Sequence, residues 1–111
     1  MKPSIVIVED DASVGEALRT VLELDGYEVA VFESAEDMFA GPAPATGDCV
    51  ILDVNLPGMS GLQALERLHR SNPGLAAIVV SARATEDMRR EAARLKALDF
   101  LEKPIDIDAL L

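Results

Sequence analysis

Residues 49–53 have the sequence CVILD, four apolar residues followed by a carboxylate, and two other segments have a similar pattern. Residues 5–10 are IVIVED and residues 78–81 are IVVS. Runs that are apolar on both faces are typical of parallel strands covered by helices on both sides. The carboxyl ends of such strands meet at one edge of the sheet, where open α/β proteins bind ligands. The sequence therefore predicts that the polar residues after these runs form one site.

The expected site contains carboxylates, a hydroxyl and an ammonium group. The carboxylates are Glu9, Asp10 and Asp53, the hydroxyl is that of Ser81, and Lys103 follows a fourth apolar run. Two carboxylates 4 Å apart repel each other by roughly 4 kcal/mol at an effective dielectric constant of about 20. Such a cluster needs a bound cation or a raised pKa. A hydroxyl and an ammonium beside it suit an anion, so the pattern indicates a site for a metal and a phosphate.

Short apolar runs alternate with amphipathic segments along the whole chain. Residues 13–25 have apolar side chains at the spacing of one helix face, and Gly26 follows where a helix end requires positive φ. Ser34, Ser60 and Thr85 have the chemistry of N-caps for three more helices. This alternation predicts a doubly wound α/β sandwich with a five-stranded parallel sheet. The expected strands are residues 4–8, 28–32, 49–53, 76–80 and 98–101.

Composition limits the functional classes. The chain has 111 residues, enough for one domain, and a net charge of −10 from 10 basic and 20 acidic residues. A surface this acidic is unsuited to nucleic acid. The apolar runs are shorter than the ~20 residues of a membrane span, and a signal-peptide pattern is absent at the start of the sequence. Cys49 has no second cysteine to pair with and is expected to pack in its strand. We expect a cytoplasmic domain that does not contact nucleic acid or membrane directly.

The end of the sequence predicts an incomplete element. Residues 105–111 are IDIDALL, which has the apolar spacing of a first helical turn. So few residues do not form a stable helix alone. Our hypothesis is that the chain is part of a longer protein, and a gene that ends at Leu111 would contradict it.

Four segments resemble the receiver domain of two-component response regulators. They are VEDD (8–11), LDVNLPGMSG (52–61), VSA (80–82) and DFLEKP (99–104). They occur in the order and spacing of that family, and the resemblance covers residues 4–108. It implies a flavodoxin-like three-layer sandwich with strand order 2-1-3-4-5 and a truncated fifth helix. It also implies that residues 1–111 are a single receiver domain, at the N-terminus of a longer response regulator.

The resemblance assigns roles to residues of the expected site. Asp53 corresponds to the phosphoacceptor, which a sensor histidine kinase or phosphotransfer protein would phosphorylate. Glu9 and Asp10 correspond to the acidic pair that holds Mg²⁺ together with Asp53 and the backbone carbonyl of Asn55. Oxygen ligands of this kind suit Mg²⁺. Phosphoryl transfer to a carboxylate depends on charge neutralisation and alignment more than on acid–base catalysis.

The resemblance also implies a conformational switch. Ser81 and Lys103 would contact the phosphoryl oxygens through charge-assisted hydrogen bonds, and Ser81 and Phe100 would be the switch residues. Family members have a cis peptide at the position of Lys103-Pro104. The domain would catalyse only its own phosphorylation and dephosphorylation, so it is not expected to be an enzyme.

The face formed by the fourth helix and fifth strand would contact a second copy or an output domain. Arg89, Arg90 and Arg94 lie on the expected fourth helix, and Arg83 lies just before it. They either pair with acidic neighbours in solvent or contact a partner. The segments 52–61 and 99–104 resemble those of receivers in DNA-binding transcription regulators, so control of transcription is the expected output, by association only.

Simpler interpretations exist for individual residues. Asp11 is expected to cap the first helix rather than bind metal. The alternatives to the functional roles are a turn serine for Ser81, a surface lysine for Lys103 and a core residue for Phe100. His69 is expected to be a solvated helix residue, because charged residues surround it in the sequence.

The sequence departs from the family pattern in two places. The acidic pair begins with Glu9 rather than an aspartate, and Lys96 stands where a glycine is usual. If Lys96 has positive φ, the strain is about 1 kcal/mol.

Three other functional classes fit the sequence less well. A phosphohydrolase of the haloacid dehalogenase type would need an acid where Asn55 stands. A pseudo-receiver that binds partners without phosphorylation would have lost some of the site residues. A Rossmann domain would need a glycine fingerprint after the first strand, which is absent from the sequence.

Overall fold

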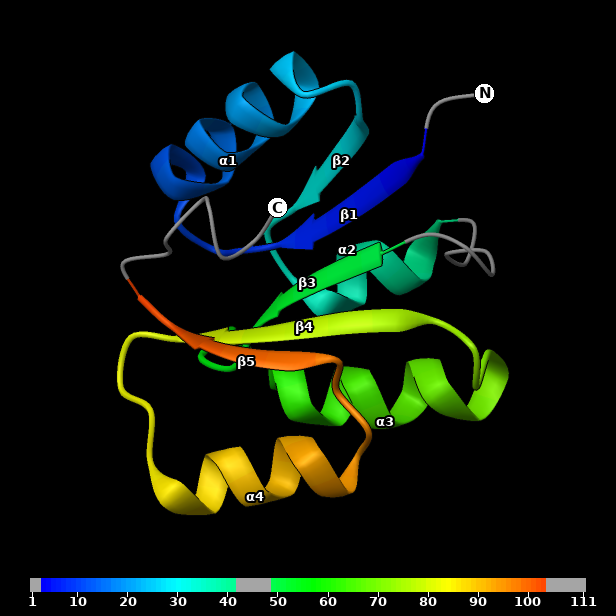
Figure 1. The fold of residues 1–111 in the computed structure, drawn as a ribbon, viewed down its shortest axis with the longest axis vertical. Coiled ribbons are helices and arrows are strands. Elements are labelled where there is room, and N and C mark those ends of the chain that lie inside the picture. Colours follow the sequence, from blue (N-terminus) through cyan, green and yellow to red (C-terminus); the bar gives the residue numbers. More distant parts are fainter. Residues whose placement is uncertain (1–2, 42–48, 104–111) are drawn as a thin grey trace.

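The computed structural model describes residues 3–41 and 49–103, and in these ranges five strands alternate with four helices (Figure 1). The strands are β1 (Ser4–Val8), β2 (Glu28–Phe32), β3 (Cys49–Asp53), β4 (Ala76–Ser81) and β5 (Asp99–Glu102). The helices are α1 (Ala12–Leu24), α2 (Ala35–Ala40), α3 (Gly61–Ser71) and α4 (Glu86–Arg94).

The sheet is parallel, and its strand order is β2-β1-β3-β4-β5. This order and the doubly wound fold class confirm the prediction. The bounds of β1, β2 and β3 are those expected, whereas β4 and β5 differ slightly. β4 includes Ser81 because Ser81 pairs with Glu102 and its carbonyl accepts a hydrogen bond from Lys103 N at 2.8 Å. β5 begins at Asp99 rather than Leu98.

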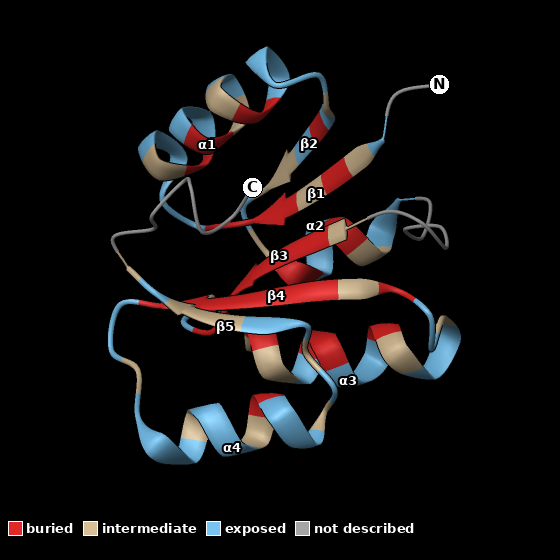
Figure 2. Ribbon diagram, viewed as in Figure 1, coloured by how far each residue is buried: buried red, intermediate tan, exposed pale blue. Residues whose placement is uncertain are grey.

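Helices cover both faces of the sheet. On one face, α2, α3 and α4 pack against inward-facing residues of the central strands, such as Val50 and Leu52. On the other face, α1 packs against residues such as Ile7 and Ile51. Since successive strand residues point to opposite faces, the continuous apolar run of β3 supplies both cores. Figure 2 shows that β3 and β4 lie in the buried centre of the molecule.

Side-chain caps begin all four helices. The Asp11 carboxylate accepts hydrogen bonds from Ser13 N at 2.9 Å and Val14 N at 3.3 Å, which confirms it as the N-cap of α1. Ser34 and Thr85 cap α2 and α4, and Ser60 forms a capping box with Gln63 at the start of α3. These local bonds satisfy backbone N–H groups that have no partner inside the helix. They explain why the helix starts could be predicted to within one residue.

Lys96, which stands where a glycine is usual in the family, has a left-handed backbone conformation. Its φ is 65°, in the turn that ends α4. The turn is closed by a hydrogen bond from Lys96 N to the carbonyl of Ala93 at 3.0 Å, and by one from Ala97 N to Ala92 O at 2.9 Å. A side chain at this φ costs about 1 kcal/mol, so the packing of α4 holds the lysine in a conformation better suited to glycine.

The prediction that His69 is solvated was wrong. Its ring is half-buried, with Nδ1 at 2.8 Å from the carbonyl oxygen of Leu95 and Nε2 at 3.0 Å from that of Leu75. One ring nitrogen donates in each neutral tautomer and both donate in the imidazolium. The charged sequence neighbours Glu66 and Arg70 are exposed. They misled the prediction because adjacent helix residues point in different directions, and His69 points toward the C-terminal end of α4.

Two predictions concern residues outside the described ranges. They are the incomplete fifth helix at residues 105–111 and the peptide bond between Lys103 and Pro104. Among the described helices, none has the length and apolar character needed to cross a membrane.

Candidate functional site

The carboxyl edge of the sheet brings together the carboxylates that the sequence predicted. Glu9 and Asp10 directly follow β1, and Asp53 is the last residue of β3. One carboxylate oxygen from each of these residues lies within 4.8 Å of those of the other two. Glu9 and Asp53 are each only 2% exposed, whereas Asp10 faces solvent. The site is therefore an acidic cluster with a buried inner part and an open rim.

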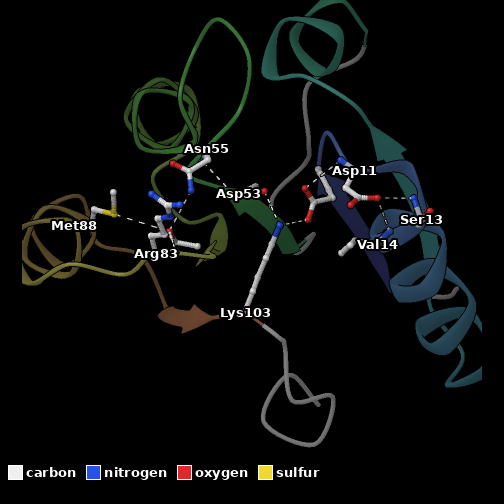
Figure 3. Close-up of polar contacts among 10 residues, drawn as sticks. Asp11, Ser13, Val14, Asp53, Asn55, Arg83, Met88 and Lys103 are labelled. Atoms are coloured by element: carbon white, nitrogen blue, oxygen red, sulfur yellow. Dashed lines mark hydrogen bonds and ion pairs between the residues drawn. The ribbon is translucent and has the colours of Figure 1, made fainter.

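Lys103 joins this cluster from the end of β5. Its Nζ lies 2.7 Å from Asp53 Oδ2 and also donates to Glu9 Oε1. Figure 3 shows the extended lysine side chain pointing at Asp53. The lysine side chain is 20% exposed and those of both partners are 3% exposed. Ion pairs removed from water this far are only weakly screened, so the ammonium and the two carboxylates act as one electrostatic unit.

The pKa of Glu9 is raised from its ordinary value of 4.5 to about 7. Burial is the largest cause, and the neighbouring Asp53 raises the pKa further, while the hydrogen bond from Lys103 opposes the rise. For Lys103, burial would lower the pKa, but the hydrogen bonds and charges of Asp53 and Glu9 outweigh it and raise the pKa above its usual value. One ammonium does not fully neutralise this group of carboxylates. An all-oxygen cluster of this kind suits a hard divalent cation such as Mg²⁺.

The Asp53 carboxylate is held at both of its oxygens. Oδ1 accepts a hydrogen bond from Asn55 N at 3.0 Å, and Oδ2 accepts from Lys103. The backbone beyond it is tightly packed, because a Cβ atom added at Gly61 would collide with the carbonyl oxygen of Asp53. Asn55 is exposed and lies at the rim of the site. The metal-binding role of its backbone carbonyl stays a prediction.

Ser81 lies at the end of β4 and is fully buried. Its hydroxyl accepts a hydrogen bond from Arg83 N at 3.1 Å and a longer one from Asn55 Nδ2 at 3.5 Å. The same hydroxyl donates to Met88 Sδ at 3.9 Å, in the first turn of α4 (Figure 3). Ser81 therefore connects the loop after β3 with the start of α4. The contact between Ser81 and Met88 was not predicted from the sequence.

Phe100 is half-buried in β5 and packs at the edge of the core that α4 covers. The Arg89 guanidinium carbon lies 5.0 Å from the centre of its ring, and an Arg89 nitrogen lies 3.8 Å from a carboxylate oxygen of Glu102. Arg90 and Arg94 instead pair with Asp87 and Glu91 of their own helix. Among these three arginines, Arg89 is the one that joins α4 to β5. The structure supports a packing role for Phe100, and its role as a switch stays a prediction.

The comparison with known families agrees with this geometry. The family model for the response regulator receiver domain matches residues 5–111. The chain belongs to this family. Receiver domains are signalling domains that bind Mg²⁺ at an acidic pocket, and Glu9, Asp10 and Asp53 form such a cluster here. Receivers of response regulators interact with histidine kinases or phosphotransfer proteins.

Solved receiver domains have the same fold. The response regulator receiver domain protein from Methanospirillum hungatei has a TM-score of 0.92 and 27% identity, over 99% of this chain and 88% of that one. The non-phosphorylated HemR receiver domain from Leptospira biflexa has a TM-score of 0.90 and 30% identity, over 98% of this chain and 88% of that one.

Curated relatives are transcriptional or response regulators that are longer than this receiver domain. The transcriptional regulatory protein FixJ of Azorhizobium caulinodans is 35% identical over 95% of this chain and 50% of its own length. The response regulator protein FleR of Pseudomonas aeruginosa is 38% identical over 100% of this chain and 24% of its own length. The chain thus spans half or less of the length of these relatives.

Proposed function

We propose that this receiver domain accepts a phosphoryl group on Asp53 from a histidine kinase or phosphotransfer protein, in a reaction that depends on Mg²⁺. Phosphorylation then changes the face formed by α4 and β5 and so controls an output. One observation supports this above all: a buried carboxylate at the end of β3 is held between an ammonium and a backbone N–H, beside two more carboxylates.

Asp53 would act as the nucleophile. A carboxylate oxygen attacks the phosphorus atom of a phosphohistidine, a P–O bond forms and the P–N bond breaks, which leaves the histidine nitrogen with the electron pair. A carboxylate is a weak nucleophile, so alignment and neutralisation of charge matter most. The hydrogen bonds at both Asp53 oxygens support such an alignment.

Glu9, Asp10, Asp53 and the backbone carbonyl of Asn55 would hold the Mg²⁺. Their oxygens fit the ligands that Mg²⁺ prefers, and a single ammonium, that of Lys103, faces the buried carboxylates of Glu9 and Asp53. When bound, the ion neutralises negative charge on the transferred group.

The switch would follow from competition for Lys103 and Ser81. New phosphoryl oxygens on Asp53 attract both side chains. Ser81 would then give up its contact with Met88, and the first turn of α4 would lose one of its attachments to the site. Phe100 would rotate into the space that this movement leaves, against its present contact with Arg89. The α4–β5 face would then present a different surface to a second copy or to an output domain.

We further propose that residues 1–111 are the N-terminal receiver of a longer cytoplasmic regulator of transcription. Similarity to the transcriptional regulatory protein FixJ supports this output. The alternative is a pseudo-receiver that binds partners without phosphorylation. A phosphohydrolase is less well supported, because Asn55 stands where such an enzyme needs an acid.

Intact mass tests the proposal. After incubation with Mg²⁺ and acetyl phosphate, the protein should gain the mass of one phosphoryl group, and this gain should be absent with EDTA or with Asp53→Asn. Binding of Mg²⁺ without any gain in mass, also in the presence of a histidine kinase, would favour the pseudo-receiver. A gain that persists in Asp53→Asn would place the phosphoacceptor elsewhere.

A further inference from the structure

The carboxylate of Glu36 joins α2 to the loop between β3 and α3. Glu36 lies in the first turn of α2, and its Oε2 accepts a hydrogen bond from Met59 N at 2.9 Å. The neighbouring Gly58 has a φ of 71°, and a Cβ atom added to it would collide with the Glu36 carboxylate. The Glu36 carboxylate therefore lies close to two adjacent backbone positions of the loop.

The rest of this loop, residues 54–60, is held by other contacts. Near Asp53, Val54 N donates to the carbonyl of Val80 at 2.9 Å, and Asn55 N donates to the Asp53 carboxylate. At the far end, Ser60 belongs to the capping box of α3. Within the described ranges, the bond to Glu36 is the one that connects residues 57–59 to another element.

The charge of Glu36 strengthens this contact. The hydrogen bond from Met59 N lowers the pKa of Glu36 below its usual value, so the side chain is a carboxylate at neutral pH. Backbone N–H groups bind a charged acceptor more strongly than a neutral one. Glu36 is exposed and lies outside the acidic cluster, so its effect on the site passes through the loop backbone.

We propose that Glu36 is a positioning residue for the phosphoacceptor site. Its carboxylate holds Met59, and through it the loop that carries Asn55, in the conformation that offers the Asn55 carbonyl to Mg²⁺. This inference rests on the proposed function for its link to Mg²⁺. The hydrogen bond and the close approach at Gly58 are its independent structural basis.

The first test uses the metal-free protein. Glu36→Ala removes the acceptor, Glu36→Gln keeps an acceptor oxygen without the charge, and Asp37→Asn removes a charge from the same turn as a matched control. Amide hydrogen exchange measured by NMR should show that Met59 loses about fivefold of its protection in Glu36→Ala, the size expected for one hydrogen bond. Glu36→Gln should retain most of the protection and Asp37→Asn all of it. Equal melting temperatures among the variants would separate this local effect from a general loss of stability.

The second test is the Mg²⁺ dependence of phosphorylation by acetyl phosphate. Glu36→Ala should raise the half-saturating Mg²⁺ concentration about fivefold, while the rate at saturating Mg²⁺ stays close to that of the wild type. Glu36→Gln should restore most of the affinity. This split between affinity and maximal rate is expected of a positioning residue and not of a group that contacts the phosphoryl group.

The outcomes are distinct. If Met59 keeps its protection in Glu36→Ala, or loses it while Mg²⁺ affinity stays unchanged, the positioning role is overturned and the proposed function stands. If the wild type neither binds Mg²⁺ nor becomes phosphorylated, the proposed function fails and the positioning role fails with it. Loss of both protection and affinity in Glu36→Ala, with recovery in Glu36→Gln, supports the inference.

Discussion

Replacing Glu9 with glutamine should stabilise the metal-free domain at alkaline pH. Glu9 is buried beside Asp53, and its pKa is raised from the ordinary value of 4.5 to about 7. Through the linkage between proton binding and folding, this rise corresponds to about 3 kcal/mol of stability that is lost when Glu9 ionises. Glutamine imitates the neutral acid, but it also weakens the pairing of Lys103. We therefore expect a net gain of about 1–3 kcal/mol for Glu9→Gln at pH 8.

The free energy of unfolding should decrease as the pH rises, because the pKa of Glu9 is higher in the folded state than in the unfolded state. The folded state binds the Glu9 proton more tightly than the unfolded state does. The stabilisation from Glu9 is therefore complete below pH 4.5 and disappears as the pH rises to about 7 and beyond. The pKa of Lys103 is raised above its usual 10.5, so its contribution is lost only at higher pH and is constant in this window.

Urea unfolding followed by circular dichroism, in EDTA, measures the effect at pH 5.5 and pH 8. The advantage of Glu9→Gln over the wild type should be larger at pH 8 than at pH 5.5. Glu33→Gln, which changes an exposed carboxylate, should show no such difference. Saturating Mg²⁺ at pH 8 should stabilise the wild type by mass action and so reduce or reverse the advantage of the variant. Equal effects at both pH values would refute the reasoning that burial and Asp53 disfavour the Glu9 charge.

Three other substitutions test separate parts of the structure. Lys103→Met leaves the buried carboxylates without their ammonium. The metal-free domain should therefore lose about 2–3 kcal/mol of unfolding free energy at pH 8, measured by urea unfolding. An unchanged urea midpoint would show that the buried ion pairs do not stabilise the domain. Lys96→Gly removes the side chain from a residue with positive φ, so the free energy of unfolding should rise by about 1 kcal/mol. Lys96→Ala should give no such gain. Equal urea midpoints for the two variants would contradict backbone strain at Lys96. His69→Leu removes a ring whose two nitrogens contact backbone carbonyls, including the hydrogen bond that the protonated nitrogen donates, and should cost about 1–3 kcal/mol. Amide exchange should be faster at the C-terminal end of α4, and normal exchange there would show that the ring does not hold the helix.

Much of the fold could be predicted because its signals are local. Asp11, Ser34, Ser60 and Thr85 cap helices through bonds to backbone groups two or three residues away. The strands are marked by runs of apolar residues, and the sheet order followed from the family resemblance. The carboxylates of the site could be predicted as well, because the ends of parallel strands meet at one edge.

Contacts between elements were harder to predict from the sequence. No local pattern indicates that Glu36 accepts a hydrogen bond from Met59, or that the Ser81 hydroxyl contacts Met88. His69 was assigned to solvent for the same reason. These partners lie in different elements or in the loops between them. Their distances depend on how helices and loops pack against the sheet.

The amino-acid sequence by itself determined the elements, their order and the set of acidic, hydroxyl and ammonium groups at one sheet edge. Hydrophobic periodicity and helix capping depend on residues a few positions apart, so both can be recognised in a short stretch of sequence. Tertiary structure alone decided that Lys103 bridges Glu9 and Asp53, that Arg89 lies over Phe100 and that Glu36 accepts a hydrogen bond from Met59. These contacts depend on angles and distances between packed elements, which hydrophobic patterning does not specify.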